Sequence, residues 1–209
     1  MNKATKKSDR KDGFLFVGNE LALDFLNTRP VQNGEPSELL PNFSALLRWF
    51  RAADLLNSEE VSRLQNQYGG TARAQNTVKE MLQLREKLRK EILNWEHGGA
   101  IHRSATDELN RLMAEHPMLT RLTANGHVHS TELWFELRDP QDLFAPLAHS
   151  TAKLLSEVDR KCVRKCDQCV LHFQDTSKKG RRRWCSMQLC GNRLKVAAYA
   201  ARRRLHAHG

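Results

Sequence analysis

Residues 76–96 carry the clearest periodic pattern of the chain. Lysine, arginine and glutamate fill one side of this segment, and apolar residues recur every three or four positions on the other, at Met81, Leu84, Leu88, Ile92 and Trp95. This spacing predicts an amphipathic helix with its apolar face in a core. Similar patterns and capping signals predict helices at residues 43–56, 57–67, 104–116 and 140–158, and one that begins after Gly18 or Asn19.

The period changes in residues 119–138. Asn125 and Gly126 form a dipeptide typical of a tight turn, and the sequence LWFEL that follows is typical of a strand. We therefore expect a mainly α domain with a small β-hairpin element (an α+β class) over residues 13–159. A mobile basic N-terminus at residues 1–12 precedes it, and a separate module follows at residues 160–209.

Charge is distributed unevenly along the 209 residues. The chain has 34 Lys and Arg against 24 Asp and Glu, a formal charge of +10. Residues 160–209 hold 14 of these cations and only Asp167 and Asp175 as acids, a net charge of +12, which leaves −2 for the rest. A basic region of this kind favours contact with a polyanion, although a solvated tail is the alternative. The candidate nucleic-acid contacts are Lys178, Lys179, Arg181, Arg182, Arg183, Arg193, Lys195, Arg202, Arg203 and Arg204.

Composition excludes several classes of protein. Hydrophobic residues make up 40% of the chain, enough for a core. No apolar run approaches the roughly 18 residues of a membrane span, and no secretory signal is evident, so we expect a cytoplasmic protein. We find no glycine-rich phosphate loop, no nucleophile elbow and no supported Cys/His dyad, and we expect no enzymatic activity.

Four of the five cysteines fall within 25 residues and form two close pairs. Cys166 and Cys169 are separated by two residues, fifteen residues follow, and Cys185 and Cys190 are separated by four. Two such pairs suit a tetrahedral ion, with zinc favoured over iron, and four protein ligands predict a closed structural site. Cys162 is left over.

Some choices stay open at this point. Cys162 could replace Cys166 as a ligand, although the two-residue spacing is the commoner one. His172 is a further candidate ligand, but a histidine in such a position is more often simply exposed. Trp184 is expected to pack against the metal site rather than stack on a base.

Two motifs resemble known families. The sequence from Trp184 to Lys195, with its Cys190-Gly191-Asn192-Arg193 core, resembles the CGNR-type zinc finger. The sequence from Gly18 to Thr28 resembles the start of the ABATE domain that usually precedes this finger. The resemblance implies a bacterial stress-induced transcription regulator with a DNA-binding finger, which would be treble-clef-like and end in a basic helix at residues 191–205. It also implies one structural zinc held by Cys166, Cys169, Cys185 and Cys190, with Asn192 in a structural role and Arg193 undecided between phosphate and Asp175.

The N-terminal domain offers one further candidate site. Asp24, Asn27 and Arg29 form a polar cluster beside an apolar run and could line a small-molecule pocket; capping and core hydrogen bonds are the alternative. Our first functional hypothesis is a DNA-binding transcription regulator whose helical domain senses an effector or forms a homodimer. An RNA-binding or ribosome-associated protein is the second, and an enzyme anchored by the finger is the third.

Overall fold

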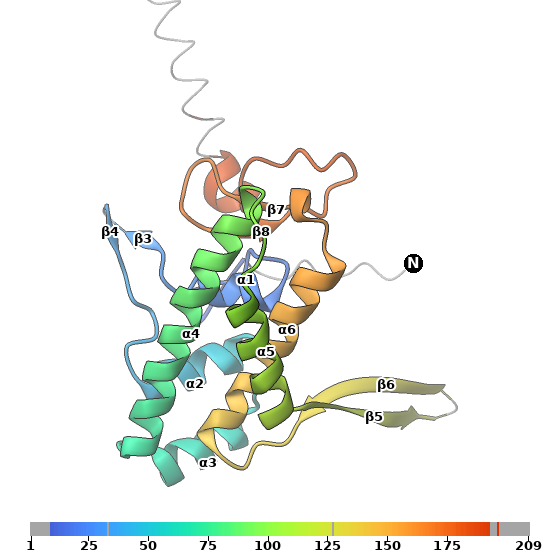
Figure 1. Cartoon of the computed structure of the whole chain (residues 1–209). Helices are drawn as coiled ribbons and strands as arrows, with labels where there is room; N and C mark the ends of the chain where they lie inside the picture. The colour runs from blue at the N-terminus through green and yellow to red at the C-terminus, as the bar shows by residue number, and fades with distance from the viewer. Residues whose placement is uncertain (1–8, 33, 127, 193–195, 197–209) are drawn as a thin grey trace, which may run out of the picture.

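The computed structural model describes residues 9–32, 34–126, 128–192 and 196. A bundle of helices forms its body, with the C-terminal module at one end and a hairpin projecting near the other (Figure 1). The α-helices of these residues are α1 (Leu21–Leu26), α2 (Phe43–Ala52), α3 (Ser58–Tyr68), α4 (Ala72–Glu96), α5 (Arg103–Glu115) and α6 (Phe144–Glu157). Short helical turns are the 3₁₀ segments η1 (Pro140–Leu143) and η2 (Arg160–Cys162) and the π-helical turn η3 (Met187–Gly191).

The strands pair antiparallel, each with its neighbour in the chain. They are β1 (Arg10–Lys11) with β2 (Phe14–Leu15), β3 (Val31–Gln32) with β4 (Glu35–Pro36), β5 (Met118–Asn125) with β6 (Val128–Phe135), and β7 (Val163–Lys165) with β8 (His172–Gln174). The expected α+β class with a small hairpin element is confirmed.

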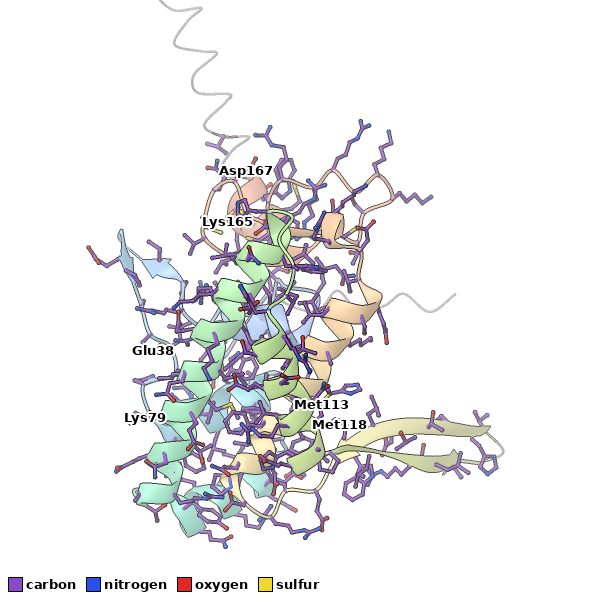
Figure 2. The ribbon with its side chains drawn as sticks, in the orientation of Figure 1. Glu38, Lys79, Met113, Met118, Lys165 and Asp167 are labelled. Atoms are coloured by element: carbon purple, nitrogen blue, oxygen red, sulfur yellow. The ribbon has the colours of Figure 1, made fainter. Side chains whose placement is uncertain are left out.

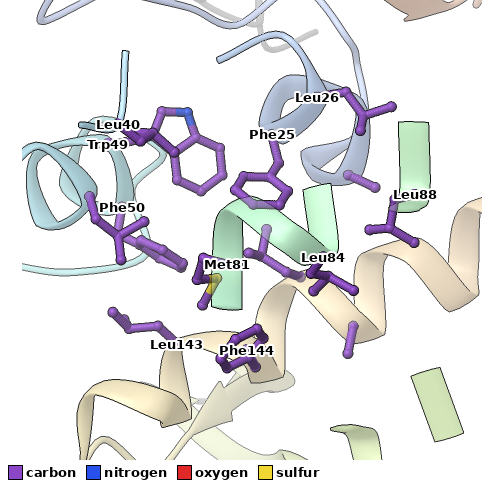
Figure 3. Packing of buried hydrophobic residues seen from close by; sticks show 14 of the residues in the cluster. Phe25, Leu26, Leu40, Trp49, Phe50, Met81, Leu84, Leu88, Leu143 and Phe144 are labelled. Atoms are coloured by element: carbon purple, nitrogen blue, oxygen red, sulfur yellow. The ribbon is translucent and has the colours of Figure 1, made fainter. Parts of the chain in front are cut away.

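Helix α4 buries its apolar face in the core, as its sequence pattern predicts. Its buried residues Met81, Leu84 and Leu88 belong to the same core cluster as Phe25, Trp49 and Phe50 (Figure 3). The Trp49 and Phe50 rings meet edge to face with centroids 5.0 Å apart, a geometry that aromatic quadrupoles favour.

Side-chain caps begin three of the described α-helices, α2, α3 and α4. Asn57 and Glu60 form a reciprocal capping box at the start of α3, which satisfies two backbone donors that the helix leaves free. The helix predicted at residues 104–116 starts one residue earlier, at Arg103 after His102. The predicted helix at 140–158 begins as the 3₁₀ turn η1, because Pro140 follows the Asp139 cap.

The sequence pattern gave no signal for a buried ion pair inside the bundle. Arg85 of α4 is 1% exposed and donates to both carboxylate oxygens of Glu38, at 2.9 and 2.5 Å, and to the Thr28 hydroxyl. Burial would raise the pKa of Glu38, but the hydrogen bonds from Arg85 and from the Leu40 amide hold it below its ordinary value. Glu38 therefore neutralises the positive charge that Arg85 brings into the core.

Residues 9–12 correct the expectation of a mobile tail through residue 12. Arg10 and Lys11 form strand β1, and Asp12 accepts hydrogen bonds from Arg48 of α2 at 2.9 and 3.0 Å. The Ser186 hydroxyl of the C-terminal module donates to the Asp9 carboxylate. Among the described residues, no helix is long and apolar enough to cross a membrane.

Candidate metal centre

Four cysteine sulfur atoms converge in the C-terminal module. Cys166 follows strand β7, Cys169 lies in the turn before β8, Cys185 follows the loop after β8, and Cys190 lies in η3. Their Sγ atoms all lie within 4.8 Å of one another. Within the part of the chain that the structure describes, Cys162 lies outside this group. The fourth cysteine of the group is therefore Cys166 and not Cys162.

The spacing of the sulfur atoms fits a tetrahedral metal. Cys169 and Cys185 are 3.7 Å apart, Cys185 and Cys190 are 3.8 Å apart, and Cys190 and Cys169 are 3.7 Å apart. Zinc bound at about 2.3 Å from each of four sulfurs would set tetrahedral edges of about 3.8 Å. A disulfide would need about 2.05 Å. The four residues therefore fit one structural zinc ion, and a closed set of protein ligands leaves no position for a substrate.

The electrostatics of the sulfur group favour a cation. A hydrogen bond from Cys185 lowers the pKa of Cys169 to about 5, while burial and the neighbouring thiolate raise the pKa of Cys190 to about 12. The hydrogen bond to Cys169 and burial likewise raise the pKa of Cys185. The Cys169 thiol therefore ionises readily, and its negative charge opposes ionisation of the neighbouring thiols. A divalent cation would offset this repulsion and allow all four cysteines to bind as thiolates.

A small apolar cluster supports the ligands. Val17, Leu171 and Phe173 are buried around Cys166, Cys185 and Cys190, and Trp184 packs against this cluster, as expected. Gly191 is needed for close approach: a Cβ there would lie 2.6 Å from the Met187 sulfur and 3.0 Å from the Trp184 Nε1. The glycine of the Cys-Gly-Asn-Arg sequence thus makes room for the indole beside the last ligand.

Two family models match the chain. The ABATE family, described as "Putative stress-induced transcription regulator", matches residues 19–158, which is 140 of the 209 residues. The chain belongs to the ABATE family. The CGNR zinc finger matches residues 162–203 and contains all four cysteines of the cluster. No curated protein matches the chain.

The CGNR finger presents a cationic loop between its two cysteine pairs. Buried Asp175 fixes both ends of this loop, because its carboxylate accepts from the Ser177 amide at 3.0 Å and from the Arg182 amide at 2.7 Å. Gly180 turns the chain with a φ of 54°, in the region that favours glycine. The side chains of Lys178, Lys179 and Arg181 are exposed.

The other predicted nucleic-acid contacts divide into three groups. Arg182 is half-buried, lies 4.7 Å over the Phe173 ring and donates to the Trp184 carbonyl, so it supports the finger from within. Arg183 is exposed and pairs with Asp167 at 2.6 Å. Five predicted contacts lie outside the described residues: Arg193, Lys195, Arg202, Arg203 and Arg204. Of the predicted helix at residues 191–205, the structure describes only residues 191, 192 and 196. Asn192 itself is exposed and ends η3.

The finger is hydrogen-bonded to the ABATE domain through its strand β8. The Asn27 side chain donates to the His172 carbonyl at 2.9 Å and accepts from the His172 amide at 2.8 Å. The Gln174 amide donates to the Gly18 carbonyl, and the Asn19 side chain donates to the Gln174 carbonyl, at 2.8 Å each. Together these bonds attach β8 to both ends of the segment that carries α1.

His172 corrects the expectation that it is exposed. It is 2% exposed and lies outside the described metal cluster. Its side chain lies on the side of the finger that meets the end of α4. Its Nε2 lies 3.5 Å from Glu96, whose carboxylate also accepts from the Lys165 amide at 2.6 Å. Lys165 lies beside the finger end of α4 in Figure 2. The contact was missed because 76 residues of chain separate Glu96 from His172.

The three predicted pocket residues do not line one pocket. Asn27 binds the finger, Arg29 lies 3.3 Å from Glu86, and Asp24 accepts from the Gly18 amide at 2.7 Å. Asp24 alone borders a cavity of about 720 Å³ between the ABATE domain and the finger. The finger contributes Arg182, Trp184, Cys185, Ser186, Met187 and Gln188 to its wall.

Proposed function

We propose that this ABATE protein is a DNA-binding transcription regulator whose zinc finger contacts the phosphate backbone through the loop at residues 176–181. The observation that carries the proposal is the cationic loop whose two ends are both hydrogen-bonded to Asp175. Lys178, Lys179 and Arg181 are exposed there, and no ion pair links them to a described acidic residue. The nearest acid in the chain, Asp175, is buried and bound to backbone amides and to Arg164 instead.

Pre-ordering makes this loop a better anion site than a flexible tail of equal charge. The metal ligands Cys169 and Cys185 flank it, and Asp175 joins its two ends. Fewer conformations are then lost when the cations meet phosphates, so more of the interaction energy appears as affinity. Each phosphate neutralised also releases condensed counterions, which drives association at low salt.

Part of the finger's charge serves its own fold. Zinc with four thiolates carries a formal charge of −2, and nearby cations offset it. Arg182 stacks on Phe173, and Arg164 donates to the Gly180 carbonyl at 2.6 Å. These two arginines stabilise the module, and the exposed loop cations remain for a partner.

We also propose that the protein is not an enzyme and that the ABATE domain receives the signal. A zinc with four protein ligands activates no water. The cavity between domain and finger supports a signalling role, because a molecule bound there would touch Trp184 and Met187, which flank the metal ligand Cys185. Its occupancy would act on the finger directly.

The test compares two variants that remove the same charge. Lys178, Lys179 and Arg181 are replaced by glutamine in one variant. In the control, three exposed lysines of α4 and α6, Lys79, Lys90 and Lys153, are replaced by glutamine; Lys79 lies along α4 away from the finger (Figure 2). Binding of a labelled DNA duplex is measured by fluorescence anisotropy.

The proposal expects the loop variant to lose at least about tenfold in affinity while the control stays within about twofold of the wild type. Equal losses in both variants would contradict it. Structured RNA is added as a competitor in the same assay. If RNA displaces the duplex at a far lower concentration than unlabelled DNA does, the RNA hypothesis takes precedence.

A further inference from the structure

One face of the β5–β6 hairpin carries no charged residue, among the described residues of its two strands. Antiparallel register places on this face Met118, Thr120, Leu122 and Ala124 of β5 and His129, Thr131, Leu133 and Phe135 of β6. Leu122 is 69% exposed and Leu133 55% exposed. Exposed apolar side chains that gather on one face are typical of an interaction site.

The opposite face carries the charged residues of the hairpin, and Leu119, Val128 and Trp134 also lie on it. Arg121 forms an ion pair with Glu132 and lies 5.5 Å over the Trp134 ring. The Thr123 hydroxyl lies 3.0 Å from that of Ser130. The two faces of the hairpin therefore differ in charge, because one holds an ion pair and the other holds no charged residue.

The hairpin is exposed for most of its length. Met118 lies at its base (Figure 2), and Phe135 packs at the edge of the main core, but the outer residues project from the bundle (Figure 1). A lone two-stranded ribbon is only marginally stable in water, and among the described residues no further strand pairs with its outer edges. A covered apolar face would remove that weakness.

We propose that this face is an interface between two copies of the chain, with the two apolar faces packed on each other around a two-fold axis. An uncharged face selects a partner that is itself uncharged, and the same face of a second copy meets that condition. A two-fold contact requires only that a patch complement itself. The chain's own segment 193–209 is a poorer match, since its sequence has five Lys and Arg and no acid.

The size of the face sets the expected strength. Thr120, Leu122, Ala124, His129, Thr131 and Leu133 are all exposed. At roughly 80 Å² for each side chain, two copies would bury on the order of 1,000 Å², near the lower limit of a specific interface. The dimer should therefore dissociate on dilution.

The position of the hairpin leaves the finger free. The hairpin follows the C-terminal end of α5, whereas the finger binds Glu96 at the C-terminal end of α4, and the two lie at different ends of the bundle (Figure 1). Dimerisation here would not cover the loop at residues 176–181. The inference does not rest on the proposed DNA binding.

The test uses the full chain and a matched pair of variants. Leu122→Glu puts a charge on the apolar face, and Val128→Glu puts one on the opposite face at a residue that is equally exposed, 69%. Molar mass is measured by sedimentation and by light scattering, up to roughly 100 μM, because an interface of this size is expected to bind weakly. Circular dichroism and zinc content show that each variant is folded.

The wild type and Val128→Glu should approach 48 kDa, twice the 24.0 kDa of one chain, and fall toward 24.0 kDa on dilution. Leu122→Glu should stay at 24.0 kDa, with a dissociation constant raised at least about tenfold. Thr131→Arg, on the same face, should behave like Leu122→Glu. A monomeric wild type, a dimeric Leu122→Glu protein, or equal losses in Leu122→Glu and Val128→Glu would each overturn the proposal.

Discussion

Replacing Asn27 with alanine should loosen the zinc finger from the helical domain. Asn27 is 2% exposed, and its amide satisfies both the carbonyl and the amide of His172, at 2.9 and 2.8 Å. Alanine would leave both backbone groups of a buried residue without partners. The zinc ligands are untouched by the change, so the finger can keep its metal while it loses its attachment.

The expected cost follows from the two lost bonds. A buried backbone group left unsatisfied costs about 1–3 kcal/mol, so two cost about 2–4 kcal/mol after some relaxation. At 1.4 kcal/mol per factor of ten, opening of strand β8 should become about 30- to 700-fold more frequent. In Asn27→Asp, strand β8 should open more often than in the wild type and less often than in Asn27→Ala, because the carboxylate can still accept from the His172 amide.

Hydrogen exchange measures this opening directly. The amides of residues 172–174 should exchange faster in Asn27→Ala, while the α4 amides keep the wild-type rate. Asn19→Gly is the control: Asn19 donates one exposed bond to Gln174, and its φ of 60° is one that glycine adopts without strain. It should change the exchange rate less than tenfold. Unchanged exchange in Asn27→Ala would refute the idea that this side chain joins the two parts.

Three further predictions concern the metal, its glycine and the buried ion pair. Cys185→Ser or Cys190→Ser should release the zinc and unfold residues 166–190 while the helical signal in circular dichroism remains; one equivalent of zinc in both variants by mass spectrometry would exclude this ligand set. Gly191→Ala should displace the Trp184 indole, cost about 1–3 kcal/mol and shift the tryptophan emission. The lowered pKa of Glu38 stabilises the fold above the unfolded value near 4.5, and this contribution is lost as pH falls through the folded value, so acid denaturation of Glu38→Gln should depend less on pH over that range.

Local signals in the sequence predicted the main helices and the β5–β6 hairpin, but not the short strand pairs β1–β2, β3–β4 and β7–β8. The α3 capping box and the α4 apolar stripe involve residues three or four apart, so short-range geometry determines them. The four cysteines were likewise predictable, since one ion must be reached by all four from two short turns. The extra 3₁₀ turn at Pro140 and the true start of α5 show the usual uncertainty at helix ends.

Contacts between distant residues could not be predicted from the sequence. Asn27 and His172 are 145 residues apart, and Arg85 and Glu38 are 47 apart. Asn27 was considered as part of a ligand pocket because a buried amide can bind a ligand as well as it binds backbone. Only the tertiary structure shows that strand β8 takes up both of its hydrogen-bonding groups.

The salt dependence of DNA binding tests the central claim most directly. The logarithm of the association constant is plotted against the logarithm of salt concentration for the wild type and for the variant with glutamine at residues 178, 179 and 181. If the loop at residues 176–181 contacts phosphates, the negative slope should become shallower by about 2.7 in the variant, which is 0.9 for each of the three cations removed. A slope that is the same in both proteins would contradict the claim that this loop is the contact surface.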